Sequence, residues 1–301
     1  MDLNLEIIIE QARVNSLTTL TLMGKQISKL PDSIGNLHHL TSLQLSDNQL
    51  TSLPDSIGNL SQLRYLIVNQ NRLTSLPGSI GNLSKLTYLN LENNQINSLP
   101  DNIINISTLT GLDLKSNQID TLPESIDRLS GLVGIGLCNN RLTRLPSSIV
   151  HISSLETLIL GGNQLTSLPP KFSKLSNLNY LELSNNKLTK LPKNIGDLSE
   201  LNYLELNNNQ LTSLPRSICR LANLIYLQLN DNQLTKLPKN IGNLTKLIGL
   251  ELNNNQLTRL PSSIGKLSML NCLEFKNNQL TSLPTSIDNF VRLNSLDLGL
   301  N

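Results

Sequence analysis

Apolar residues recur along this chain with a single fixed period. Leu17 is followed by a leucine at every twenty-third residue, and thirteen successive units follow one another without an insertion or a deletion. The unit reads LxxLxLxxNxLxxLPxxIxxLxx, and the last copy stops at its ninth residue. Such periodicity is typical of stacked coils, each of which buries its apolar side chains against its neighbours. The units start at Leu17, Leu40, Leu63, Leu86, Leu109, Leu132, Leu155, Leu178, Leu201, Leu224, Leu247, Leu270 and Leu293.

The two halves of each unit have different spacings. Positions 4 and 6 of the unit are apolar and positions 3 and 5 mostly are not, which is typical of a short, half-buried strand. Equivalent strands one unit apart are expected to pair in parallel at a spacing of about 4.8 Å. The proline at position 15 cannot donate a ladder hydrogen bond, so it ends the strand. The apolar residues at positions 18 and 21 then suit one helical or 3-10 turn on the way back.

A single unit is too small to fold alone. Burying its roughly seven aliphatic side chains gives about 10 to 20 kcal/mol, whereas ordering each residue costs about 1 to 2 kcal/mol. The missing stability has to come from stacking, because neighbouring units share a core and form hydrogen bonds between their strands. Asparagine fills position 9 in twelve of the thirteen units, and Lys25 is the exception. We interpret this column as a structural ladder that satisfies backbone groups in the turn after the strand, not as a set of ligands.

The Leu-Pro pair in mid-unit identifies the repeat more closely. It occurs twelve times in register, from Pro31 to Pro284. The unit resembles the 23-residue form of the leucine-rich repeat over residues 17–301, and is similar to repeats of cytosolic Ras-group proteins and of bacterial Roc-COR proteins. The resemblance implies an α/β repeat fold: a right-handed solenoid, or horseshoe, with a parallel concave β-sheet and short helical, 3-10 or irregular convex segments.

The two ends of the chain lead to different expectations. Residues 1–16 resemble the helical cap that precedes such bacterial repeats, and residues 17–301 form the repeat domain. No comparable cap follows Asn301, so the edge of the last strand and its leucines are expected to be exposed. Either the chain is a piece of a longer protein, or it associates end to end through this uncapped repeat. The apolar face of the predicted cap comprises Leu5, Ile8, Ile9 and Ala12, and the exposed leucines are Leu293, Leu296 and Leu298.

Composition and charge exclude several classes of function. The formal net charge is +2, which argues against a whole-chain electrostatic grip on nucleic acid or on an anionic membrane. No apolar run reaches the roughly 20 residues that a membrane span requires. The three cysteines are widely separated, which favours a reducing compartment. The acidic start of the chain does not match a signal peptide. We therefore expect a cytoplasmic protein that binds neither nucleic acid nor membrane.

Function can be sought at the positions that packing leaves free. All five tyrosines fall on position 3, which is expected to face out of the sheet on the concave side, and position 5 beside them is acidic toward the C-terminus. Rigid aromatic anchors beside carboxylates are typical of a surface that docks a basic protein segment. The alternative is that these residue types simply suit exposed strand sites. The candidate partner-binding residues are Tyr65, Tyr88, Tyr180, Glu182, Tyr203, Glu205, Tyr226, Glu251 and Glu274.

Position 16, just after the proline, changes sign along the chain. It is acidic in the early repeats and basic in the later ones. The cations are separated by whole repeats and lack interleaved aromatic residues, so we interpret them as a solvated rim and not as a nucleic-acid groove. The charged residues at this position are Asp32, Asp55, Asp101, Glu124, Lys193, Arg216 and Lys239.

Catalytic motifs are not found in the sequence. There is no phosphate-binding loop, nucleophile elbow or zinc-protease motif, and the three histidines have no cysteine or serine close in register. A column of glutamates without loop carbonyls makes a poor Ca²⁺ cage. No catalytic residue, cofactor or metal is therefore expected. The histidines, which we interpret as surface residues, are His38, His39 and His151.

These observations predict a non-enzymatic scaffold that binds a partner protein on its concave face in intracellular signalling. Two alternatives remain open. The chain could be the recognition half of a larger signalling enzyme, a GTPase or a ubiquitin ligase, that continues past Asn301. It could instead be a surface or adhesion protein, which would require an export signal.

Overall fold

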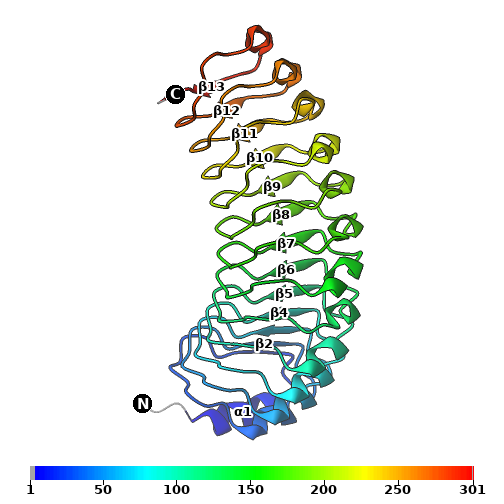
Figure 1. Ribbon diagram of the computed structural model, residues 1–301. Helices are drawn as coiled ribbons and strands as arrows, with labels where there is room; N and C mark the ends of the chain where they lie inside the picture. The colour runs from blue at the N-terminus through cyan, green and yellow to red at the C-terminus, as the bar shows by residue number, and fades with distance from the viewer. Residues whose placement is uncertain (1–3, 300) are drawn as a thin grey trace. The chain divides into compact units, whose positions relative to one another are not determined.

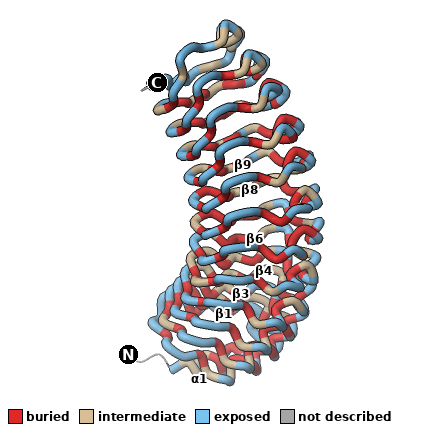
Figure 2. The backbone as a smooth tube through the Cα atoms, viewed as in Figure 1, coloured by how far each residue is buried: buried red, intermediate tan, exposed pale blue. Residues whose placement is uncertain are grey.

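The structure, a computed structural model, describes residues 4–299 and 301. The chain divides into two units. The first comprises Met1–Leu142 and Pro146–Leu155, and the second comprises Thr143–Leu145 and Glu156–Asn301. Within each unit the chain winds in successive coils, with strands along one side and short helices along the opposite side (Figure 1). Figure 2 shows that buried positions recur in successive coils and are lacking in the last coil at the C-terminal end.

One α-helix precedes the first strand. Helix α1 (Leu5–Val14) is capped by Asn4, whose side chain accepts a hydrogen bond from the Ile7 amide at 3.4 Å. Ile9 and Ala12 are buried, and α1 packs against the first 3-10 helix. The helix therefore covers the apolar side of the first repeat. The predicted cap also included residues 1–3, which lie outside the described residues.

The strands of the first unit are short and parallel. Each has three residues, and within this unit each pairs with the equivalent strand of a neighbouring repeat, so a shift of 23 residues relates every pair of partners. The central residue of each is buried, as the alternation of apolar and polar positions predicts. These strands are β1 (Thr19–Thr21), β2 (Ser42–Gln44), β3 (Tyr65–Ile67), β4 (Tyr88–Asn90), β5 (Gly111–Asp113) and β6 (Gly134–Gly136).

The second unit repeats this arrangement. Its strands also pair in chain order and in the same register. Leu296 and Leu298, in and beside the last strand, are 43% and 37% exposed, as expected for a strand that pairs with β12 alone within the described residues. The strands are β7 (Thr157–Ile159), β8 (Tyr180–Glu182), β9 (Tyr203–Glu205), β10 (Tyr226–Gln228), β11 (Gly249–Glu251), β12 (Cys272–Glu274) and β13 (Ser295–Asp297).

The return half of each of the twelve complete repeats forms a 3-10 helix that begins one to three residues after the proline of the Leu-Pro pair. The prediction of parallel strands joined by short 3-10 segments is therefore confirmed in both units. The segments are η1 (Asp32–Asn36), η2 (Asp55–Asn59), η3 (Gly78–Asn82), η4 (Asp101–Asn105), η5 (Ile126–Arg128), η6 (Ser147–His151), η7 (Phe172–Lys174), η8 (Ile195–Asp197), η9 (Arg216–Arg220), η10 (Ile241–Asn243), η11 (Ser262–Lys266) and η12 (Thr285–Asn289).

Each of the repeats that begin at Leu40 to Leu247 contributes seven buried apolar side chains to the core of its unit. In the repeat that contains β9, six of them are fully buried and the leucine of the Leu-Pro pair is 8% exposed. The strand supplies two, and the turn and the 3-10 segment supply most of the others. These residues are Leu201, Leu204, Leu206, Leu211, Leu214, Ile218 and Leu221.

Asparagine at position 9 joins each coil to the one before it. The Asn209 side-chain oxygen accepts a hydrogen bond from the Leu188 amide of the preceding repeat at 3.0 Å. Its side-chain nitrogen donates to the carbonyl of Leu183 in the preceding repeat and to that of Leu206 in its own repeat. Asn209 is only 7% exposed, so water cannot replace these bonds readily. The column is the structural ladder that the sequence predicts.

Glycine at position 19 lets neighbouring 3-10 segments approach closely. A methyl group added to Gly196 would lie 1.8 Å from the carbonyl oxygen of Ser217 in the next repeat. Five other repeats show the same arrangement, with separations from 1.9 to 2.6 Å. The close stacking of these segments therefore depends on glycine. The five residues are Gly35, Gly58, Gly81, Gly242 and Gly265.

Asn209→Ala is expected to lower the free energy of unfolding by about 2 to 4 kcal/mol, because it leaves the buried Leu188 amide without its partner and removes one of the two asparagine donors at the carbonyls of Leu183 and Leu206. Urea denaturation followed by circular dichroism measures the change. The matched control is Gln210→Ala, because the neighbouring Gln210 side chain is exposed. Equal stability of the two variants would contradict the role given to the asparagine ladder.

Gly196→Ala is expected to destabilise the protein by about 1 to 3 kcal/mol, because the new methyl group forces two packed backbones apart. Gly134→Ala is the control, since a methyl group there meets no atom within 4 Å. Thermal melting of the two variants distinguishes them. A Gly196→Ala protein as stable as the wild type would show that the segments can separate at no cost.

Candidate functional site

The tyrosines at position 3 of the second unit form a continuous aromatic column. The ring centroids of Tyr180 and Tyr203 are 5.8 Å apart with planes tilted by 46°, and those of Tyr203 and Tyr226 are 5.5 Å apart and nearly parallel, at 9°. Tyr203 and Tyr226 are each 36% exposed, whereas Tyr180 is half-buried. Parallel pairing brings these residues into register. The rings are therefore held in place by one another before any partner arrives.

The column ends where a glycine provides space for the last ring. A methyl group on Gly249 would come within 2.6 Å of the Tyr226 ring, so that ring lies over the backbone of β11. In the first unit Gly111 has the same relation to Tyr88, also at 2.6 Å. Each ring at these two sites leans toward the following repeat, and glycine at position 3 of that repeat permits it.

Glu182 is the most strongly constrained carboxylate of the site. It accepts hydrogen bonds from the backbone amides of Gly161 at 2.6 Å and Ser184 at 2.9 Å. Burial raises the pKa of Glu182, and these two bonds oppose the rise without cancelling it. The residue therefore acts first as a structural acceptor that links two repeats.

Glu205 binds the aromatic column directly. The Tyr180 hydroxyl donates a hydrogen bond of 2.6 Å to its carboxylate. Burial, this bond and the negative charges of Glu205 and Glu182 all raise the pKa of Tyr180 well above the usual range of a phenol. The phenol consequently stays protonated and fixed, which orients the first ring of the column.

Asparagines at position 7 support the remaining carboxylates, and the sequence reasoning missed them. Asn230 donates from its side chain to Glu251 at 2.7 Å, and Asn253 donates to Glu274 at 2.7 Å. Their side-chain oxygens accept the backbone amides of Asn253 and Lys276, one repeat further on. Asn207 bonds Gln228 in the same way. The recurrence of asparagine at position 7 was the signal that could have predicted this second ladder.

We refer to the tyrosines and glutamates of this region as the tyrosine–glutamate surface. Its carboxylates are half-buried and already hydrogen-bonded, so they are less available than the sequence suggested, although each retains further acceptor capacity. Tyr65 and Tyr88 lie on β3 and β4 of the first unit, where they are register neighbours. The surface itself consists of Tyr180, Glu182, Tyr203, Glu205, Tyr226, Glu251 and Glu274, all in the second unit.

The two cysteines with a shifted pKa are not activated as nucleophiles. No disulfide joins the three cysteines. Burial raises the pKa of Cys219, and burial together with a hydrogen bond to Glu274 raises the pKa of Cys272. A raised pKa disfavours the thiolate that a nucleophile requires. Among residues 4–299 and 301, no group of three or more histidine, cysteine or acidic residues is placed to hold a metal ion.

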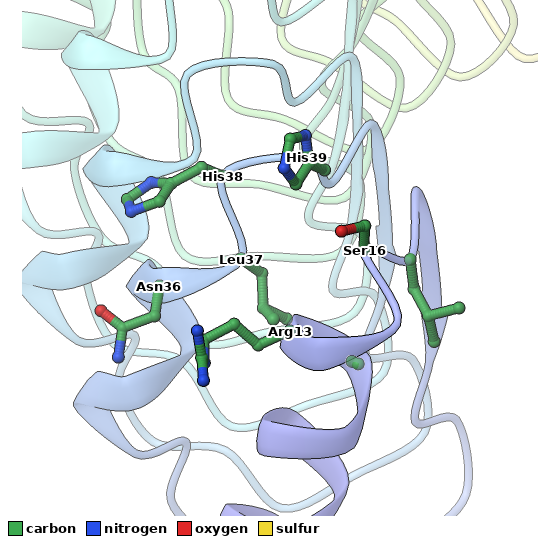
Figure 3. A pocket seen from close by; sticks show the side chains of 8 residues that line it. Arg13, Ser16, Asn36, Leu37, His38 and His39 are labelled. Carbon is green, nitrogen blue, oxygen red and sulfur yellow. The ribbon is translucent and has the colours of Figure 1, made fainter.

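The exposed histidines of the first repeat line a shallow hollow. His38 and His39 surround it together with Arg13 and Asn36, near the end of helix α1 (Figure 3). Arg13 is already paired with Glu10 at 2.7 Å, and no carboxylate or thiol lines the hollow. His151 lies 3.7 Å from Asp127 at the protein surface. These positions fit the prediction of surface histidines.

Comparison with known families identifies the repeat. A model of the leucine-rich repeat region matches residues 12–87, 75–160, 171–233 and 218–300, and a second leucine-rich repeat model matches 154–175. The chain belongs to the leucine-rich repeat family. A comparison with curated proteins gives no match. In the described part of the chain, no helix has both the length and the apolar character needed to cross a membrane.

Solved structures agree with this assignment. A leucine-rich repeat protein of Leptospira interrogans is 37% identical, with a TM-score of 0.81, covering 97% of this chain and 80% of that one. The functional domain of the internalin InlJ of Listeria monocytogenes is 26% identical, with a TM-score of 0.81, and the match covers 94% of this chain and 58% of that one. A chain of the Drosophila Toll–Spatzle complex is 26% identical, with a TM-score of 0.83, and the match covers 95% of this chain and 41% of that one.

The raised pKa of Glu182 predicts a pH-dependent stability. In the interval between the ordinary glutamate pKa and the raised one, the folded protein binds more protons than the unfolded chain. The free energy of unfolding should therefore fall as pH rises through that interval. Glu182→Gln cannot ionise and should lack this component of the slope, as measured by urea denaturation from mildly acidic to neutral pH. Identical slopes for both proteins would contradict the assignment.

Proposed function

We propose that this protein is a non-enzymatic interaction scaffold, and that the tyrosine–glutamate surface docks a basic segment of a partner protein. The observation that carries the proposal is the stacked, partly exposed pair of Tyr203 and Tyr226 beside half-buried carboxylates. Packing does not dictate tyrosine at position 3, because serine, glycine, threonine and cysteine occupy it in other repeats. The recurrence of tyrosine at a position that packing leaves free favours a role in recognition over a role in folding.

The energetics of the surface suit protein recognition. Tyrosine offers a large contact area with few rotatable bonds, so ordering it on binding costs little entropy. The stacking of the rings reduces that cost further, because the side chains are already ordered. The column is long enough to contact several residues of an extended segment. Tyr180 contributes less area than the other two, since it is half-buried and bonded to Glu205.

The charge of the surface sets the kind of partner. Positions 3 and 5 of β8 to β12 contain four glutamates and no lysine or arginine. Lysine or arginine side chains of a partner can reach the carboxylate lone pairs that the asparagine ladder leaves free. Hydrogen bonds within the protein hold the glutamates close together although their charges repel one another. A cationic segment bound to them would reduce this repulsion.

A role at the cell surface is the second candidate. Solved relatives of this chain include an internalin of Listeria monocytogenes and the Drosophila Toll–Spatzle complex. Three widely separated cysteines that no disulfide joins favour a reducing compartment, and we therefore propose a cytoplasmic location for the scaffold. Cell fractionation of the native host separates the two candidates, because a surface protein would be found in the membrane or culture fraction.

A signalling role also remains part of the proposal. In one form the chain acts alone as a scaffold in an intracellular pathway. In another it is the recognition half of a signalling enzyme, whose catalytic domain would be encoded after Asn301. Inspection of the open reading frame beyond that residue distinguishes these two forms.

Tyr203→Ala is expected to weaken partner binding by about 1 to 3 kcal/mol without unfolding the protein. The partner is first isolated as a protein captured by the wild type and lost with a Tyr180/Tyr203/Tyr226 triple alanine variant. Calorimetry with the purified partner then measures the single variant. Met269→Ala is the matched control, because Met269 has the same exposed fraction of 36% but lies after a 3-10 segment of the same unit. Unchanged affinity in Tyr203→Ala would exclude this surface.

A further inference from the structure

The second unit has a groove that runs along the return halves of three successive repeats and is not lined by any strand residue. Its volume is about 980 Å³. The residues that line it lie around the Leu-Pro pair or in the 3-10 segment that comes next. None of them belongs to the tyrosine–glutamate surface. The groove is therefore a separate feature of the unit. Its lining falls in residues 213–219, 236–240 and 259–262.

Four cationic side chains line the groove. Arg216, Lys236, Lys239 and Arg259 are all exposed, and none of them has an ion pair or a side-chain hydrogen bond within the structure as described. No aspartate or glutamate lines the groove. Exposed cations of the same sign that lie close together and lack internal partners create a local positive potential.

The cationic stripe continues into the preceding repeat. Lys190 and Lys193 occupy the same two repeat positions, 13 and 16, as the groove cations, and both are exposed. The nearest acid in the following 3-10 segment, Asp197, is already hydrogen-bonded to Arg220. Across four successive repeats, positions 13 and 16 thus hold six cations and no acid.

This charge is not a consequence of the repeat. In the first unit the same position 16 holds exposed acids at Asp32, Asp55 and Asp101. Coils with either sign at this position have the same strand and 3-10 architecture, so packing leaves the choice free. The sequence reasoning interpreted the cations as a solvated rim, because their separation by whole repeats gave no sign that they line a common groove.

The floor of the groove is aliphatic. Leu214, Leu237 and Leu260 lie between the cations with exposures of 5% to 8%, and Pro238 and Pro261 flank them. No aromatic ring lines the groove, and aromatic rings are the surface on which the bases of a single-stranded nucleic acid stack. An aliphatic floor between cationic walls instead suits a chain that carries both carboxylates and aliphatic side chains.

We propose that this groove binds an acidic segment of a partner protein, in which glutamate or aspartate alternates with aliphatic residues. The carboxylates pair with Arg216, Lys236, Lys239 and Arg259, and the aliphatic side chains contact the Leu-Pro floor. Because the groove repeats its charges once per coil, an extended segment running across successive coils meets one set of cations after another. This site is independent of the tyrosine–glutamate surface.

The test uses a fluorescent peptide of alternating glutamate and leucine as the probe, with fluorescence anisotropy as the readout. The wild type should bind it saturably, and Lys236→Glu/Lys239→Glu should weaken binding by about tenfold or more. The control Lys246→Glu/Lys266→Glu makes the same change in net charge at exposed lysines of the same unit that do not line the groove. It should retain the wild-type affinity, as should Tyr203→Ala.

Several outcomes would overturn the proposal. Absence of saturable binding would do so, as would equal loss of affinity in the two double variants, which would indicate an effect of bulk charge. Equal binding of a peptide with glutamine in place of glutamate would show that charge is irrelevant. Inorganic polyphosphate or a DNA duplex that binds more tightly, with the same dependence on Lys236 and Lys239, would assign the groove to phosphate polymers. Salt-dependent dimerisation that is lost in Lys236→Glu/Lys239→Glu would assign it to a second copy of this chain.

Discussion

The structure depends on satisfying the backbone groups that each turn buries between neighbouring coils. After a three-residue strand the chain turns back, and its amides and carbonyls are then too deep for water. Asparagine at position 9 supplies both a donor and an acceptor at this point, and it reaches the preceding coil as well as its own. A change of one residue in the length of a coil would move this side chain away from its partners. That constraint explains why the twelve complete units keep one length.

The same logic shapes the tyrosine–glutamate surface. Glutamates on adjacent parallel strands repel one another, and such a column requires compensation. The second asparagine ladder provides it at Glu251 and Glu274, the Tyr180 hydroxyl provides it at Glu205, and two backbone amides provide it at Glu182. The surface is therefore rigid as well as acidic. A rigid surface loses little entropy when it binds, which is the physical basis of the recognition role proposed for it.

The second unit presents opposite charges at different positions of one repeat. Its strands carry half-buried glutamates, whereas its Leu-Pro segments expose lysines and arginines around an aliphatic groove. Because the core and the position-9 ladder involve other positions, the groove cations can change without disturbing the fold, whereas the glutamates also take part in internal hydrogen bonds. The relatives of known structure share the architecture at 26% to 37% identity, and a shared architecture leaves the choice of partner to these free positions.

The sequence by itself determined the coil, the strand, the proline-initiated 3-10 segment and the asparagine ladder, because each follows from local chemistry repeated at a fixed period. It also placed the tyrosines on an exposed face, since side chains alternate along a strand. Tertiary structure decided what depends on contacts between coils: the parallel stacking of Tyr203 on Tyr226, the support of the carboxylates by Asn230 and Asn253, and the need for glycine at Gly196. It also decided that cations a whole repeat apart, such as Arg216 and Lys239, line one groove, because stacking converts a separation along the chain into proximity in space.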